Sequence, residues 1–197
     1  MNVLFPILLA RYRFTATLRD PVRLPDYAGS LLRGQFGAAL RGVACMTRQP
    51  TCGACPLLAT CPYTRIFEAP PPPQHNLQKF SNIPNAYVME PPPIGVQGLP
   101  AGGALVFHMV LAGDALGQLP LVIFAWQRAL AHGLTKSRSV ANLISVEWLD
   151  AQNQAHPVWH RDAPVIAEHA AALSLPSAEP VTSVTSDQLT LHIHAPL

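Results

Sequence analysis

The sequence predicts an α+β domain in which two helices alternate with strands in the order β-α-β-β-α-β. Three observations support this prediction. Short runs of strand-forming residues are bounded by Pro and Gly, two longer segments repeat their apolar residues at helical spacing, and the two kinds of segment alternate along the chain. With 197 residues, 49% of them apolar, the chain is long enough to bury a core.

The first strand and the first helix are expected before the cysteines. Phe5 to Leu18 reads as a strand, and Pro25 and Asp26 open a helix over Tyr27–Ala44, with Asp26 as the N-cap. Apolar residues at helical spacing form one face of this helix: Leu32, Phe36, Leu40 and Val43.

A second face of the same helix carries Arg33, Gly37 and Arg41 at intervals of four residues. Glycines at 34, 37 and 42 leave part of the helix surface bare, although each glycine costs helix stability. We therefore expect another backbone to approach closely here, belonging either to the sheet of the same domain or to a nucleic acid.

The remaining elements follow two Pro-rich stretches. Tyr87–Glu90 and Leu105–Ala112 are predicted strands, Leu116–His132 is a predicted helix with Pro120 in its first turn, and Val140–Leu149 with His156–His160 reads as a hairpin. This order is that of the ferredoxin-like fold. We assign residues 1–162 to one such domain with an inserted cysteine loop at 45–63. Residues 163–197 are then a linker and the first strand (Leu189–His194) of an incomplete second domain.

The charge is distributed unevenly, although the net charge is only +2. Eight arginines and two aspartates precede Glu68, a net charge of about +6, while the rest of the chain carries about −4. A basic segment made of Arg alone suits phosphate recognition, because the guanidinium group pairs with two oxygens at once. There is no signal-like N-terminus and no apolar run of membrane-spanning length, so we expect a cytoplasmic protein.

Four cysteines, Cys45, Cys52, Cys55 and Cys61, have the spacing C-x6-C-x2-C-x5-C. Thiolates this close in sequence can converge on one ion or cluster at little loop-closure cost. Three interpretations remain open: two disulfides, which suit the cytoplasm poorly, a structural zinc ion, and a [4Fe–4S] cluster.

The cysteine segment resembles the iron–sulfur loop of endonuclease III and the adenine DNA glycosylases, which share the 6-2-5 spacing and an Arg-x-Pro-x-Cys run, here Arg48-Gln-Pro-Thr-Cys52. This resemblance favours a [4Fe–4S] cluster, with structural zinc as the alternative. Excision of damaged DNA bases is a weak hypothesis, because the glycosylases carry this loop after a helix-hairpin-helix that the chain lacks.

A longer stretch resembles the CRISPR repeat-processing endoribonucleases of the RAMP superfamily. It runs Leu24-Pro-Asp-Tyr-Ala-Gly-Ser-Leu-Leu-Arg-Gly-Gln-Phe-Gly-Ala-Ala-Leu-Arg41, continues through the four cysteines, and ends Cys61-Pro-Tyr-Thr-Arg-Ile-Phe-Glu68. The resemblance implies ferredoxin-like domains that bind repeat RNA. It also implies metal-independent cleavage, in which a 2′-hydroxyl attacks and leaves a cyclic phosphate. The metal centre would then be structural.

The sequence departs from that family at two points. Family members often have His where this chain has Ala38, and the Gly-rich loop expected near the family's C-terminus is not found in this sequence. The candidate catalytic groups are Tyr27, as an acid or phosphate-orienting group, and Arg33, as a charge stabiliser. The candidate RNA contacts are Arg33, Arg41, Lys136 and Arg138.

Two functions are therefore expected from the resemblance. The first is processing of CRISPR precursor RNA by an endoribonuclease or its N-terminal domain. The alternative is a non-catalytic RNA-binding subunit of a CRISPR effector complex, with other effector subunits as partners.

Overall fold

The computed structural model describes residues 8–70 and 84–169. Its elements follow in chain order: β1 (Leu9–Leu18), β2 (Val22–Arg23), α1 (Gly29–Ala44), α2 (Pro62–Phe67), β3 (Tyr87–Glu90), β4 (Gly98–Leu99), β5 (Ala104–Ala112), the 3-10 helix η1 (Gly113–Gln118), α3 (Leu119–His132), β6 (Ala141–Leu149) and β7 (Ala155–His160). Five strands form one antiparallel sheet in the order β3-β5-β1-β6-β7, and β2 pairs with β4. The predicted α+β class is confirmed.

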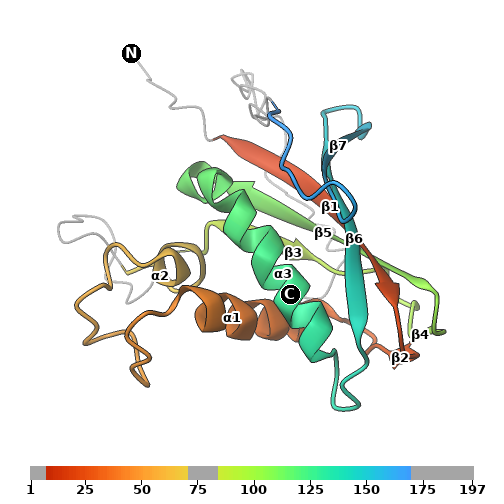
Figure 1. The fold of residues 1–197 in the computed structure, drawn as a ribbon, viewed down its shortest axis with the longest axis horizontal. Coiled ribbons are helices and arrows are strands. Elements are labelled where there is room, and N and C mark those ends of the chain that lie inside the picture. Colours follow the sequence, from red (N-terminus) through yellow and green to blue (C-terminus); the bar gives the residue numbers. More distant parts are fainter. Residues whose placement is uncertain (1–7, 71–83, 170–197) are drawn as a thin grey trace, which may run out of the picture.

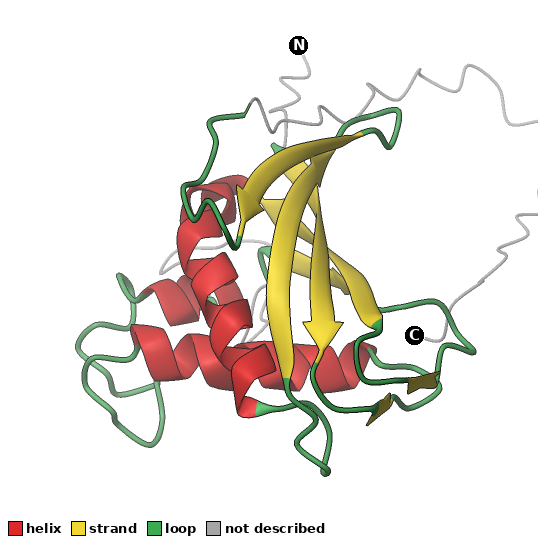
Figure 2. Ribbon diagram, turned by 45° about the vertical axis from the view of Figure 1, so that its right-hand side comes forward, coloured by secondary structure: helices red, strands yellow, loops and turns green. Residues whose placement is uncertain are grey.

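The two long helices, α1 and α3, lie together on one face of the sheet (Figures 1 and 2). Strand β1 is central, and its residues alternate between buried and half-buried because successive side chains point to opposite faces. The buried side chains include Tyr12 and Phe14, which are at most 1% exposed. Apolar burial against the helices therefore fixes which face of β1 is inside.

An aromatic cluster joins both helices to the sheet. The ring of Trp126 in α3 lies 4.4 Å from that of Phe107 in β5 and 5.4 Å from that of Phe36 in α1, measured between centroids. Phe14 of β1 stacks on Phe107 at 5.3 Å. Large buried rings contribute much of the apolar area removed from water, so this cluster is the centre of the core.

The opposite face of the sheet carries charged side chains that neutralise one another. Arg11 of β1 pairs with Glu90 of β3 at 2.7 Å, and Arg13 pairs with Glu147 of β6 at 2.8 Å. The strand register places Arg13 beside both Glu147 and His108. Burial, and then the nearby Arg11 charge, lower the pKa of His108. Both arginines of β1 thus have carboxylate partners within the sheet.

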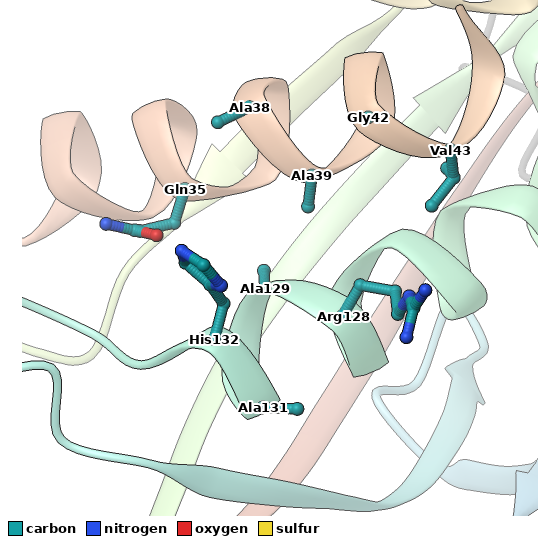
Figure 3. A pocket seen from close by; sticks show the side chains of 9 residues that line it. All are labelled: Gln35, Ala38, Ala39, Gly42, Val43, Arg128, Ala129, Ala131 and His132. Atoms are coloured by element: carbon teal, nitrogen blue, oxygen red, sulfur yellow. The ribbon is translucent and has the colours of Figure 1, made fainter.

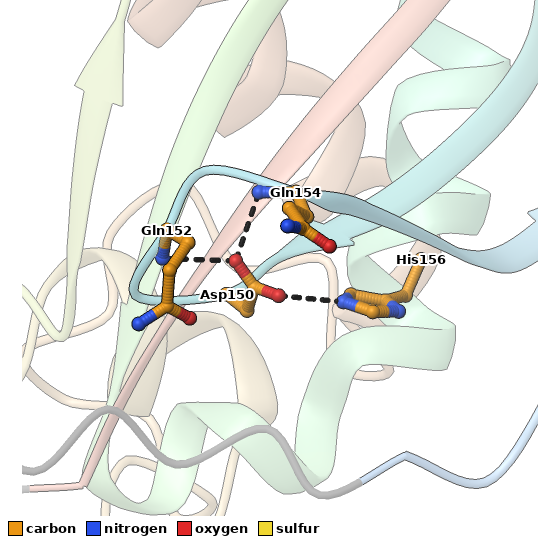
Figure 4. A network of polar contacts seen from close by, with 4 residues as sticks. All are labelled: Asp150, Gln152, Gln154 and His156. Atoms are coloured by element: carbon orange, nitrogen blue, oxygen red, sulfur yellow. Dashed lines mark hydrogen bonds and ion pairs between the residues drawn. The ribbon is translucent and has the colours of Figure 1, made fainter.

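The β6–β7 hairpin is closed by one carboxylate (Figure 4). Oδ1 of Asp150 accepts hydrogen bonds from the backbone N–H groups of Gln152 and Gln154 at 2.9 and 2.8 Å, and Oδ2 lies 2.8 Å from Nε2 of His156. The hydrogen bond with His156 is the main cause that lowers the pKa of Asp150. An aspartate that satisfies its own turn in this way is a common turn device.

Most predicted elements are observed with shifted ends. β3, β5 and the hairpin are confirmed within two residues, and α3 begins at Leu119, after η1, with Pro120 in its first turn. The prediction that Asp26 is the N-cap of α1 is wrong. The N-cap is Ala28, with no side-chain cap, and the Asp26 carboxylate instead accepts from the Gln97 amide.

Two further predictions fall partly or wholly outside the described residues. The start of the first strand, residues 5–7, and the expected strand Leu189–His194 of a second domain lie there. In the part of the chain that the structure describes, no helix is long and apolar enough to span a membrane.

Gly37 of α1 is required by packing. A Cβ atom built on it would lie 2.3 Å from the ring of Phe67 in α2, whereas one built on Gly34 would meet nothing within 4 Å. The prediction that another backbone approaches α1 at its glycines is therefore wrong within the described residues: an aromatic side chain meets Gly37, and nothing lies within 4 Å of a Cβ on Gly34 or Gly42.

These two glycines provide a matched test. We expect Gly37→Ala to lower the free energy of unfolding by about 1–3 kcal/mol, because α2 must move to admit the methyl group. Gly34→Ala should raise it by up to about 1 kcal/mol, since alanine is the better helix former. Urea unfolding of both variants checks the pair, and equal effects from the two substitutions would contradict the packing argument.

Candidate metal centre and nucleic-acid interface

The four cysteines lie in the segment that connects α1 to α2. Cys45 is the C-cap of α1, where its N–H donates to the Arg41 carbonyl at 2.9 Å, and Cys61 is the N-cap of α2. Between them, the N–H of Cys55 donates to the carbonyl of Cys52 at 3.0 Å and forms a tight turn. The two outer cysteines are thus held by helix ends, while the middle pair lies in the connecting loop.

All four thiols are free, half-buried and line one small hollow together with Tyr63 and Thr64. The Thr47 hydroxyl lies 3.4 Å from Sγ of Cys55 and 4.0 Å from Sγ of Cys45. Four cysteines around one hollow match the donor set of a structural zinc ion or a [4Fe–4S] cluster.

The thiols are not drawn together in this conformation. Across residues 8–70 and 84–169, no group of three or more Cys, His, Asp and Glu side chains is gathered closely enough to hold an ion. The four cysteines line the same hollow, but their side chains are not close enough together to bind one ion. Metal binding would therefore require the loop to tighten around the ion.

The environments of the thiols differ. A hydrogen bond from the backbone of Arg48 is the main cause that lowers the pKa of Cys45, whereas burial, and then the charge of Glu68, raise the pKa of Cys52. The cysteine at the end of α1 is therefore the more readily ionised of these two.

Helix α2 docks on α1 through aromatic rings. Phe67 stacks on Tyr63 at 5.5 Å and on Tyr87 at 5.8 Å, between ring centroids, and lies against Gly37. The Tyr63 hydroxyl donates to Glu68 at 2.8 Å, and burial together with this bond raises its pKa. This helix was not predicted from the sequence.

The two arginines predicted on α1 both contact this aromatic group. The Arg33 guanidinium lies 5.5 Å from the Phe67 ring centroid, and that of Arg41 lies 6.0 Å from the Tyr63 ring centroid. Arg33 also donates to the side-chain oxygen of Asn85 at 3.1 Å, once the amide is oriented to satisfy both of its neighbours.

Arg41 has a second role that sequence reasoning missed. Its Nη2 donates to the carbonyl oxygens of Gln49 and Pro50 at 2.6 and 2.7 Å. Both carbonyls belong to the loop between Cys45 and Cys52, so Arg41 fastens this loop to α1. Its contribution to RNA binding stays a prediction.

The other predicted site residues lie apart from the cysteines. Tyr27 precedes α1, is 40% exposed, and covers Gly29, where a Cβ would lie 2.6 Å from the tyrosine ring. Lys136 and Arg138 are exposed in the loop between α3 and β6, where Arg138 has a φ of 52°. No hydrogen bond or ion pair among the described residues joins Tyr27 to Arg33.

Two grooves flank α1 and meet on its exposed side. The α1–loop groove lies between α1 and the cysteine segment and includes Arg41 and Arg48. The α1–α3 groove contains Gln35 of α1 and Arg128 and His132 of α3 (Figure 3). Arg128 and His132 were not predicted as site residues, because helical spacing within α3 does not reveal which helix it faces.

The loop-fastening role of Arg41 can be tested with an arginine that lines the same groove. We expect Arg41→Ala to lower the free energy of unfolding by about 1 kcal/mol and to speed proteolysis within residues 46–60, since two loop carbonyls lose their donor. Arg48→Ala removes the same charge as a control. Equal cleavage rates for the two variants, measured by mass spectrometry of the fragments, would contradict this role.

A solved structure and a family model match most of the chain. In the crystal structure of a Csm3-Csm4 subcomplex in the type III-A CRISPR-Cas interference complex, one chain is similar at 16% identity with a TM-score of 0.45. That similarity covers 78% of this chain and 82% of the other. No curated protein matches the sequence. The family model AF_1859_N, described as an N-terminal domain, matches residues 5–171. Because the match spans most of the sequence, the chain belongs to the AF_1859_N family.

Proposed function

We propose that this chain is a RAMP-type domain that binds CRISPR repeat RNA and takes part in its processing. The sequence resemblance of residues 24–68 to the repeat-processing endoribonucleases supports the RNA class. The sheet order supports the finer fold, because β3-β5-β1-β6, with α1 and α3 as crossovers, is the antiparallel arrangement of a ferredoxin-like domain, to which β7 adds a hairpin strand.

The observation that carries the proposal is the absence of carboxylates from α1 and α3. Neither helix contains Asp or Glu, whereas α1 carries Arg33 and Arg41 and α3 carries Arg128. The β1 arginines on the sheet are paired with glutamates, so the helical side is the better surface for a polyanion. Phosphate contacts by arginine supply most of the sequence-independent affinity for nucleic acid.

The leading activity is metal-independent cleavage of the repeat RNA by its own 2′-hydroxyl. Tyr27 is 40% exposed beside the start of α1, and this position makes it the candidate acid. Arg33 lies one turn into the helix, and its guanidinium would stabilise the charge of the pentavalent phosphate. Such a reaction requires a base that takes the 2′-hydroxyl proton, an acid that protonates the leaving 5′-oxygen, and a charge stabiliser. Tyr27 and Arg33 would supply the acid and the charge stabiliser, and water would take the 2′-hydroxyl proton.

A non-catalytic RNA-binding subunit is the alternative, and two observations favour it. Arg33 is engaged with Phe67 and Asn85, and Ala38 on the exposed side of α1 offers no proton acceptor. In that case the domain would hold RNA for other effector subunits.

The activity is tested by incubating the protein with repeat RNA in EDTA. We expect a product ending in a 2′,3′-cyclic phosphate, because the attacking oxygen belongs to the RNA. Tyr27→Phe should slow cleavage by about 100-fold or more, the range of general acid catalysis. RNA with a 2′-deoxy group at the cleaved position is the control and should stay intact. Tight binding without cleavage would support the non-catalytic alternative.

We also propose that the four cysteines hold one structural metal centre, a [4Fe–4S] cluster by preference and zinc as the alternative. Their free thiols and shared hollow support this proposal. Such a centre would cross-link the end of α1 to the start of α2. Cys45 and Cys61 would bind from the helix ends, while Cys52 and Cys55 would bind from the loop.

Metal analysis tests the centre independently of RNA. A [4Fe–4S] cluster should make the protein brown, with broad absorption at about 400 nm. Zinc should leave the protein colourless, with one metal ion bound per chain. Cys55→Ser should lower metal content and speed proteolysis of the loop in either case. Thr51→Ser is a conservative control in the same loop. Wild type purified without metal, together with Cys55→Ser that is cleaved no faster than wild type, would contradict the proposal.

A further inference from the structure

The two grooves beside α1 are continuous across the helix. Ala38 and Gly42 line both of them and are exposed between them. A Cβ on Gly42 would meet no atom within 4 Å, so nothing in the described chain covers the helix at this point. The hollows have volumes of about 520 Å³ in the α1–α3 groove and 800 Å³ in the α1–loop groove, which is the size range of ligand sites.

Every charged side chain that lines the two grooves is basic. The α1–loop groove has Arg41 and Arg48, and the α1–α3 groove has Arg128 together with the imidazole of His132. Neither lining contains a carboxylate, and no ion pair among the described residues involves Arg48 or Arg128. The surface is therefore complementary to an anion that is long enough to reach both sides of the helix.

An exposed aromatic ring accompanies the α3 side. The Arg128 guanidinium lies 5.6 Å from the ring centroid of Phe124, which is 47% exposed. Arginine beside an accessible aromatic ring is typical of single-strand nucleic-acid sites, where phosphates meet the cation and bases stack on the ring. Figure 3 shows the side chains of Gln35 and His132 close together at the other end of this groove.

We infer that a single RNA strand crosses α1 over Ala38 and Gly42, with phosphates held by Arg48 on one side and by Arg128 and His132 on the other. The inference rests on the proposed RNA-binding function and adds the path of the strand and its contacts on α3. The bare surface at residues 38 and 42 lets the sugar–phosphate backbone pass close to the helix. A flat or convex protein partner would not require basic residues in both grooves.

The experiment measures binding of a fluorescein-labelled, mixed-sequence RNA of about 12 nucleotides by anisotropy, a length within the span of common single-strand sites. We expect the double variant Arg128→Ala/His132→Ala to bind about tenfold or more weakly. The slope of log K against log salt should become shallower by about 0.7, the loss of the one cationic phosphate contact made by Arg128 on a single strand. Arg161→Ala removes an exposed arginine outside both grooves and should bind within about twofold of wild type.

A second pair of variants keeps the test decisive if the double variant folds poorly. Ala38→Glu places a carboxylate where the grooves meet, and Ala38→Gln adds the same bulk without charge. Ala38→Glu should bind at least about tenfold more weakly than Ala38→Gln. The proposed path of the RNA strand would be overturned if Ala38→Glu and Ala38→Gln bound the RNA equally well, or if the double variant bound it as tightly as wild type. The grooves would then be assigned to a protein partner. Wild type that binds no RNA would instead overturn the proposed function, and the path with it.

Discussion

The contact between the Phe67 ring and Gly37 determines where the cysteine segment lies. Phe67 closes α2, and the same ring stacks on Tyr63 and Tyr87 and lies beneath the Arg33 guanidinium. Because glycine leaves room for the ring, α2 sits directly on α1, and the loop between the two helices must fold back beside them. The hollow lined by the cysteines and the α1–loop groove both follow from this packing.

The same arrangement explains why one helix can serve three surfaces. The Leu32–Phe36–Leu40 face of α1 is fully buried on the sheet side, the Gly37 face receives α2, and the Ala38–Gly42 side stays exposed. On each side of α1, the size of the side chains matches the space that the neighbouring element leaves. Large apolar residues fill the core, glycine admits a ring, and small residues leave the surface open.

The elements were largely predictable from the sequence, because apolar periodicity is a local property. The wrong N-cap, and the contacts that sequence reasoning missed, arose where residues distant in the sequence come close in the fold. Asp26 has the sequence context of an N-cap, but its carboxylate accepts a hydrogen bond from the side-chain amide of Gln97, which lies next to β4. The sequence suggests that Arg41 is a surface cation, but its Nη2 donates hydrogen bonds to two carbonyl oxygens of the cysteine loop. Arg128 and His132 join a groove with α1 only after the sheet has brought α3 beside it.

The excess of arginine before Glu68 overstates the positive charge that is free to meet an anion. Arg11 and Arg13 lie on the sheet, where they form ion pairs with Glu90 and Glu147. Arg33 and Arg41 lie on α1, which contains no carboxylate. Sequence counting cannot separate these two groups, because the glutamates come from strands that follow far along the chain.

The paired sheet face also shapes the electric field beyond the molecular surface. Opposite charges about 3 Å apart act together as small dipoles, and their potential fades much faster with distance than that of an isolated cation. Within roughly one Debye length, about 8 Å at physiological ionic strength, the helical side therefore dominates what an approaching polyanion experiences. For the RNA ligand proposed above, the resulting torque would turn the protein and the RNA toward a productive orientation before they touch, and the fraction of collisions that lead to association would rise.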